Sequence, residues 1–265
     1  MKKSIISFVS LVMVTLFFTS CENTADDFMT SNAKTGGLVS ATKSFPYKLG
    51  GTTSFDVSIS IPKGPGIVSI DVYKTYTGKS KVLDQTINVG SANATGDVTK
   101  SITYTYATLS AGLQMPADEG QLTIGDSFTI SYVSKMEDGR SVTNTGTTKV
   151  SVANKYAGNY KCVGTFTHPT AGVRAVNEDK YLTPISAYAC WANAGDLGSS
   201  GYFVRIAVDP LTNLVTCSTW LDIEMANYPG EQNYYDPQTG KFHLSYFYVG
   251  GTGNRVMREV FTPIK

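Results

Sequence analysis

Segments in which apolar and polar residues alternate recur between residues 38 and 153. In the first, residues 54–61, every second residue is Phe, Val or Ile, and the intervening residues are Ser or Asp. This two-residue period is typical of a β-strand with one buried and one solvated face. The same pattern marks residues 54–61, 67–76, 82–89, 101–108, 127–133 and 141–152.

Turn-forming residues separate these segments, including the Pro- and Gly-rich stretch 62–66 and the hairpin signal Asp138-Gly139. Two amphipathic sheets are stable when they bury their apolar faces against each other. We therefore predict that residues 38–153 form an immunoglobulin-like or fibronectin-like β-sandwich.

Residues 154–265 carry longer and more aromatic segments. These are residues 160–167, 184–191, 202–208, 214–223, 242–249 and 256–261. Short connections, such as the turn at residues 236–240, favour an antiparallel meander that forms a second β domain, either a sandwich or a partly open barrel. No stretch sustains a 3.6-residue period, so we expect an all-β protein with little helix.

The N-terminus has the pattern of a lipoprotein signal peptide. Lys2 and Lys3 precede an apolar run over residues 5–18, and Cys21 follows the small residue Ser20. The run is shorter than the ~20 residues of a transmembrane helix, which favours a cleaved signal peptide over residues 1–20. Cleavage would leave Cys21 as the lipid attachment site, and several acyl chains together anchor a protein stably to a membrane. The polar residues 21–37 then form a flexible tether.

The amino-acid composition narrows the range of functions that this protein can have. The chain has 16 Tyr, 12 Phe and 25 Gly, and only 16% of its residues are charged, which suits β structure. Without Lys2 and Lys3 it carries 20 basic and 21 acidic side chains, a net charge of −1. Because nucleic-acid binding depends on basic surface, we expect no nucleic-acid partner.

Three cysteines follow Cys21, namely Cys162, Cys190 and Cys217. Their number is odd and they lack C-x-x-C spacing, so no metal site is expected. One disulfide with a leftover thiol stays open as an alternative, but buried free cysteines are favoured.

The sequence offers little catalytic chemistry. His168 and His243 are the only histidines, and His243 lies within an alternating segment that suits a solvated strand face. Nucleophile-elbow, zinc-protease, Walker and dinucleotide-binding motifs are missing from the sequence. We therefore expect a protein that is not an enzyme, with no catalytic residues and no cofactor.

Aromatic residues are the main candidates for ligand contact, because rings exposed on a surface can stack on the apolar faces of sugars. Residues 228–236 form a turn-rich loop, where core aromatics are unexpected. Tyr246 and Tyr248 share a strand face with apolar neighbours and are expected in the core, whereas the pattern leaves both tryptophans open between core and surface. The candidate ligand residues are Trp191, Trp220, Tyr228, Asn233, Tyr234, Tyr235 and Asp236.

The chain resembles Bacteroidetes outer-membrane lipoproteins of polysaccharide utilisation loci. The resemblance rests on the lipoprotein start, the Tyr156-x-Gly-x-Tyr160 opening with Gly164, the run from Asn233 to Tyr248 and the Gly253-x-Arg-Val motif. The acidic residues 22, 26 and 27 also resemble the export signal of lipoproteins on the outer face of the outer membrane. Members of this group are often described only as domains of unknown function, and the SusE-like ones imply carbohydrate capture without catalysis.

Three hypotheses for the function follow from these observations. The first is a non-catalytic surface lipoprotein that binds glycan for a polysaccharide uptake system. The second is a structural partner of a SusC/SusD-type transporter, or an adhesin-like subunit, without a ligand of its own. The third is a hydrolase, against which the scarcity of histidines and the lack of a nucleophile motif argue.

The lipid anchor gives a direct prediction. Cys21→Ala should abolish palmitate labelling and move the protein out of the membrane fraction, because no other residue offers the acylation site. A mutant that still labels with palmitate and stays in the membrane fraction would contradict the lipoprotein assignment.

Overall fold

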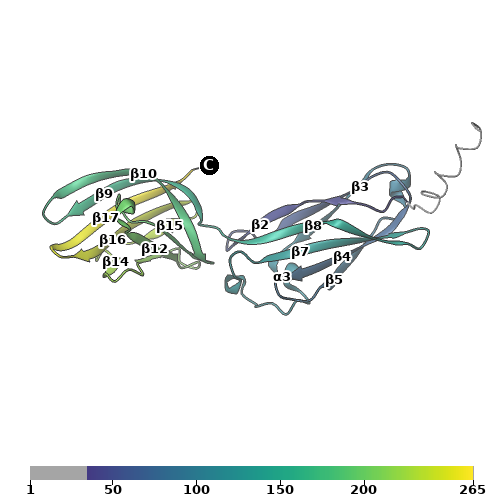
Figure 1. The fold of residues 1–265 in the computed structure, drawn as a ribbon, viewed down its shortest axis with the longest axis horizontal. Helices are drawn as coiled ribbons and strands as arrows, with labels where there is room; N and C mark the ends of the chain where they lie inside the picture. Colours follow the sequence, from purple (N-terminus) through teal and green to yellow (C-terminus); the bar gives the residue numbers. More distant parts are fainter. Residues whose placement is uncertain (1–34, 265) are drawn as a thin grey trace, which may run out of the picture.

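The protein is an all-β molecule, and the computed structural model describes residues 35–264. Figure 1 shows two β units arranged end to end, with the N-terminal unit on the right and the C-terminal unit on the left. The predicted signal peptide, Cys21 and most of the predicted tether lie outside the described residues. Within residues 35–264, no helix has the length and apolar character needed to cross a membrane.

The N-terminal unit is a sandwich of two sheets. One sheet has the strand order β1-β3-β6 and the other has the order β2-β8-β7-β4-β5, in which β2 runs parallel to β8 and the other pairs are antiparallel. The strands are β1 (Ser40–Ala41), β2 (Ser44–Leu49), β3 (Phe55–Ile61), β4 (Ile67–Tyr76), β5 (Val82–Asn88), β6 (Val98–Tyr104), β7 (Ser127–Met136) and β8 (Ser141–Asn154).

Alternation along the strands builds the sandwich core. In β3 every odd-numbered residue is buried and every even-numbered residue is exposed. β7 alternates in the same way, with its even-numbered residues buried and its odd-numbered residues half-buried. The inward-facing residues of both sheets form one apolar cluster that includes Ile59, Ile130 and Tyr132. The predicted immunoglobulin-like sandwich is therefore present.

One segment of the N-terminal unit differs from its predicted structure. Residues 101–108 were expected to be a strand, but β6 ends at Tyr104 and the helix α3 (Tyr106–Ser110) follows. The side chain of Thr105 accepts a hydrogen bond from the backbone N–H of Thr108, and the side chain of Thr108 accepts one from the backbone of Thr105. This reciprocal cap stabilises a helix start that strand periodicity does not reveal. Three short 3-10 helices, η1 (Ala92–Ala94), η2 (Glu119–Gln121) and η3 (Gly198–Ser200), lie in connections.

The C-terminal unit is a nine-stranded antiparallel sheet that curls on itself. Its order is β13-β12-β11-β10-β9-β17-β16-β14, and β15 also pairs with β16. The strands are β9 (Gly158–His168), β10 (Gly172–Ser186), β11 (Ala189–Asn193), β12 (Phe203–Val208), β13 (Val215–Ser218), β14 (Met225–Asn227), β15 (Tyr234–Asp236), β16 (Lys241–Gly250) and β17 (Gly253–Pro263).

A few polar contacts bring the two ends of this sheet together. The side chain of Asn227 on β14 accepts a hydrogen bond from the backbone N–H of Cys217 at 2.7 Å and donates one to the carbonyl of Val215 at 2.8 Å. Leu214 and Tyr234 form a β-bridge beside them. These contacts occupy edge groups of β13, so the sheet becomes a nearly closed barrel with an apolar interior.

The strand β10 was largely missed by the pattern, and residues 184–191 were wrongly expected to be one strand. Residues 184–186 belong to β10, and a turn at Ala187 and Tyr188 separates them from β11. The middle of β10 reads Asn-Glu-Asp-Lys at residues 177–180, where Lys180 faces the core. A charged residue at an inward position conceals the alternation that would identify the strand.

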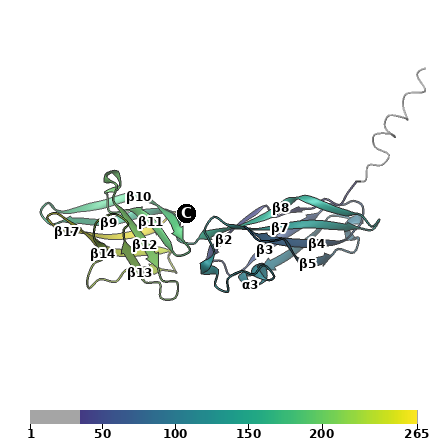
Figure 2. The same cartoon turned by 60° about the horizontal axis from the view of Figure 1, so that its bottom comes forward.

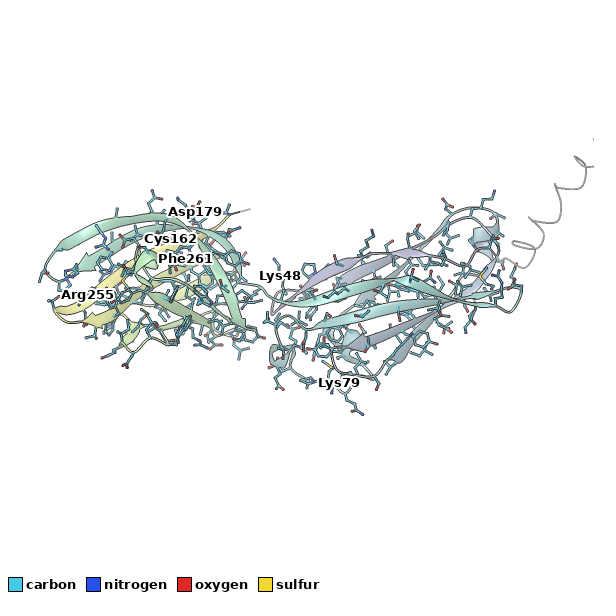
Figure 3. All side chains as sticks on the ribbon, in the orientation of Figure 1. Lys48, Lys79, Cys162, Asp179, Arg255 and Phe261 are labelled. Carbon is cyan, nitrogen blue, oxygen red and sulfur yellow. The ribbon has the colours of Figure 1, made fainter. Side chains whose placement is uncertain are left out.

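Gly164 allows strands β9 and β17 to approach closely. A Cβ atom at this position would lie 2.0 Å from the carbonyl oxygen of Arg258 and 2.8 Å from Cα of Glu259 on the neighbouring strand β17. Figure 3 shows Cys162 and Phe261 on the same two strands, β9 and β17. Only glycine permits this approach of two backbones.

The turn between β10 and β11 joins the two units. Ala187 is buried in the sandwich core, and Tyr188 packs against both cores. The side chain of Asn154, the last residue of β8, donates hydrogen bonds to the carbonyls of Ser186 and Ala189 at 2.7 and 3.1 Å. Figure 2 shows this joint as the narrow waist of the molecule. β8 ends beside the predicted boundary between residues 153 and 154, and the division into separately folding domains remains a prediction.

Gly164 provides a test of the barrel geometry. Gly164→Ala should lower the free energy of unfolding by about 3 kcal/mol, because the added methyl group overlaps the Arg258 backbone. Gly251→Ala is the matched control, since a Cβ atom there meets no atom within 4 Å, and it should change stability by no more than about 0.5 kcal/mol. Urea denaturation measures both, and equal stability of the two variants would contradict the close strand approach.

Candidate functional site

The structure brings both tryptophans together on the outer surface of the barrel. On β12, Val204 and Ile206 are buried in the core, so Phe203 and Arg205 point outward. Trp191 on β11 lies directly opposite Arg205 in the strand register. Trp220 follows β13 in a bend that returns over the same face. The outer face of β11 and β12 thus carries rings where solvated residues would be expected.

The three rings Trp191, Phe203 and Trp220 form what we call the outer aromatic cluster. Trp220 stacks nearly parallel to Phe203, with ring centroids 5.9 Å apart and an angle of 15°. Trp191 stands perpendicular to both, at 4.9 Å from Phe203 and 6.0 Å from Trp220. Trp220 is 55% exposed. A large indole ring that remains this exposed while held by two others offers a preformed apolar surface.

The predicted loop over residues 228–236 does not form one aromatic platform. Tyr228 packs edge-on against Phe247, and the guanidinium of Arg258 lies 4.9 Å from its ring centroid. Tyr234 stacks on His243 at 4.5 Å and is 39% exposed. The rings of Tyr228 and Tyr234 therefore pack against different residues and share no surface, and the Tyr234 ring is the more exposed of the two.

The remaining loop candidates have structural contacts. Tyr235 is half-buried and packs against Tyr156 and Phe242 of the barrel core. Asn233 is buried, and its side-chain oxygen accepts a hydrogen bond from the backbone N–H of Ser245 at 2.6 Å.

Asp236 caps the turn that follows the loop. Its carboxylate accepts hydrogen bonds from the Thr239 hydroxyl and the Gln238 backbone, and these bonds lower the pKa of Asp236. Asn233, Tyr235 and Asp236 therefore serve the fold in this structure.

A polar network lies inside the barrel, away from the outer aromatic cluster. The ammonium of Lys180 contacts the carboxylate of Glu259 at 2.6 Å and donates to the carbonyl of Asn193 at 2.9 Å. The hydroxyl of Tyr246 and the thiol of Cys162 donate to the same carboxylate at 2.6 and 3.1 Å. Burial lowers the pKa of Lys180, but Glu259, Cys162 and Glu178 together outweigh burial, and the net shift of the pKa is upward. Lys180 and Glu259 are buried, and Lys180 also pairs with the partly exposed Glu178 at 3.6 Å.

The cysteines and His168 are also part of the fold and do not belong to the outer aromatic cluster. Cys162, Cys190 and Cys217 are buried free thiols, as the odd count favoured. The ring of His168 accepts hydrogen bonds from the backbone N–H groups of Thr170 and Ala171 at the turn after β9.

The outer aromatic cluster is consequently the best candidate site among the described residues. Sequence reasoning named Trp191 and Trp220 but missed Phe203 and Arg205. A signal was present, because Val204, Ile206 and Val208 form the apolar face of their segment and force Phe203 and Arg205 to the other face.

A family model supports the bacterial group to which the resemblance pointed. Residues 145–262 match the model of a C-terminal domain of a Bacteroides-type family, which is consistent with a Bacteroidetes protein. The matched range begins within β8 and ends within β17, so it includes the whole outer aromatic cluster. No curated protein gives a significant match to the chain.

Burial of the three thiols predicts that they react slowly with thiol reagents in the native protein. Burial raises the pKa of Cys190 to about 12 and also raises the pKa of Cys162 and Cys217. In the variant Cys21→Ala, Ellman's reagent at pH 8 should label no thiol in the native protein and three after denaturation, because the thiolate is the reactive form. Rapid labelling of native protein would show that the barrel interior is accessible.

Proposed function

We propose that this chain is a non-catalytic lipoprotein of the bacterial cell surface, anchored in the outer membrane through Cys21, that binds a glycan through the outer aromatic cluster. In this proposal it serves a polysaccharide uptake system and works beside a SusC/SusD-type transporter. The observation that carries the proposal is the 55% exposure of Trp220, which stacks on Phe203 of strand β12.

The ring arrangement suits the chemistry of sugars. A sugar ring has an apolar face of C–H groups that stacks on an aromatic ring, and polar groups at its rim need hydrogen-bond partners. Trp220 offers the exposed indole, while Ser218 and Arg205 stand side by side in the strand register. A platform of several rings costs little conformational entropy on binding, because the rings already hold one another.

The position of the cluster in the molecule also supports the proposal. Residue 35 lies at the outer end of the N-terminal unit, where its carbonyl accepts a hydrogen bond from Arg140 near the β7–β8 turn. The C-terminal unit lies at the opposite end of the molecule. A lipid at Cys21 would place the sandwich as a spacer and hold the cluster on the unit further from the membrane.

Removing one exposed ring tests the proposal. Trp220→Ala should weaken binding to a retained polysaccharide in affinity gels about tenfold, corresponding to ~1.4 kcal/mol. Its thermal midpoint should stay close to that of the wild type, since the side chain is more than half exposed.

Tyr234→Ala is the matched control, because it removes an exposed ring of the predicted loop and leaves the cluster intact. It should retain binding. If Tyr234→Ala abolishes binding and Trp220→Ala does not, the ligand sits on the loop over residues 228–236 and the cluster is not the site. If wild-type protein is retained by no polysaccharide, glycan binding itself is disproved.

A further inference from the structure

Arg205 differs from every other arginine of the chain. The sequence has five arginines. Three of them form ion pairs at 2.6 Å, between Arg140 and Asp138, Arg174 and Asp196, and Arg258 and Glu231. Arg255 donates to the carbonyl of Gly253 and the hydroxyl of Thr252. Within residues 35–264, the side chain of Arg205 takes part in no hydrogen bond and no ion pair, and only its backbone is bonded, in the sheet.

Arg205 projects from the same face of the sheet as the rings of the outer aromatic cluster. Arg205 is opposite Trp191 on one neighbouring strand and opposite Ser218 on the other. Residues directly opposite each other on antiparallel strands have Cβ atoms about 5 Å apart. Phe203 precedes it by two residues and therefore lies on the same face.

The acidic side chains of the connection after the cluster form no ion pair with Arg205. Asp222 and Glu224 lie in the connection after Trp220, but neither comes within 4.0 Å of the guanidinium. The carboxylate of Glu259 points into the barrel and forms an ion pair with Lys180 there. It therefore lies on the opposite side of the sheet from Arg205. Among the described residues, Arg205 therefore has no carboxylate partner within 4.0 Å.

Guanidinium groups present several N–H donors in a plane, which match the oxygens of a carboxylate or a sulfate group. Such charge-assisted hydrogen bonds are stronger than neutral ones. We infer that the outer aromatic cluster recognises an acidic glycan, in which an aromatic ring stacks on a sugar and Arg205 binds the carboxylate or sulfate of that sugar or its neighbour. This inference rests on the proposed glycan binding and adds the class of glycan.

Matched pairs of polymers test the inference with the full-length protein in mild detergent. One pair is polygalacturonate and its carboxyl-reduced form, and the other is a sulfated galactan and its desulfated form. Isothermal titration calorimetry should show at least tenfold tighter binding to one acidic polymer than to its neutral counterpart, and the pair that responds identifies carboxylate or sulfate. The preference should weaken with added salt, because the contact is ionic.

Arg205→Gln should remove the preference for the acidic polymer, and Arg205→Lys should keep part of it through the retained charge. Arg140→Gln is the control, because it removes the same charge from the N-terminal unit and should leave the preference unchanged. Equal binding of acidic and neutral polymers, or a preference that survives Arg205→Gln, overturns the acidic-glycan inference and leaves glycan binding standing. Failure of the wild type to bind any of the four polymers also overturns the acidic-glycan inference, whereas glycan binding itself is decided by the affinity gels.

Discussion

The C-terminal unit depends on the closure of one curved sheet around a buried ion pair. Lys180 on β10 and Glu259 on β17 meet at 2.6 Å across the intervening strand β9, where Gly164 lets the backbones approach. A buried ion pair of this kind offsets its desolvation only with good geometry and further hydrogen bonds, here from Tyr246 and Cys162. Loss of either partner would leave an uncompensated charge in the core, so the pair fixes which strands are neighbours and which faces point inward.

Closure of the sheet also decides what the outside of the barrel presents. Once Val204 and Ile206 face the interior, the two-residue period sends Phe203 and Arg205 to the surface beside Trp191. The rings then cover each other and leave Trp220 as the accessible member. The proposed ligand surface is thus a consequence of strand register together with the bend after β13 that carries Trp220. Two of its three rings, Trp191 and Phe203, sit on strands, which suits a preorganised binding site.

Alternation was enough to predict the all-β class, the sandwich and an antiparallel meander that left a sandwich and a partly open barrel as alternatives, because half-buried strands show their two faces in the sequence. It failed at β10, where Lys180 points inward to a partner 79 residues away, and at α3, where a local cap on Thr105 overrides the strand pattern. The site was predictable only in part. Ring contacts between Trp191 and Trp220 depend on a bend after β13, and the burial of Asn233 depends on strand pairing, neither of which a single sequence reveals.

The two tryptophans of the chain both belong to the outer aromatic cluster, so indole fluorescence reports on that site alone. Fluorescence titration of the native protein with a polysaccharide that it retains in affinity gels is therefore the most direct test. The account predicts a saturable change in emission intensity or wavelength as a sugar covers Trp220. A polysaccharide that binds to saturation by calorimetry and leaves the tryptophan emission unchanged would show that the ligand sits elsewhere.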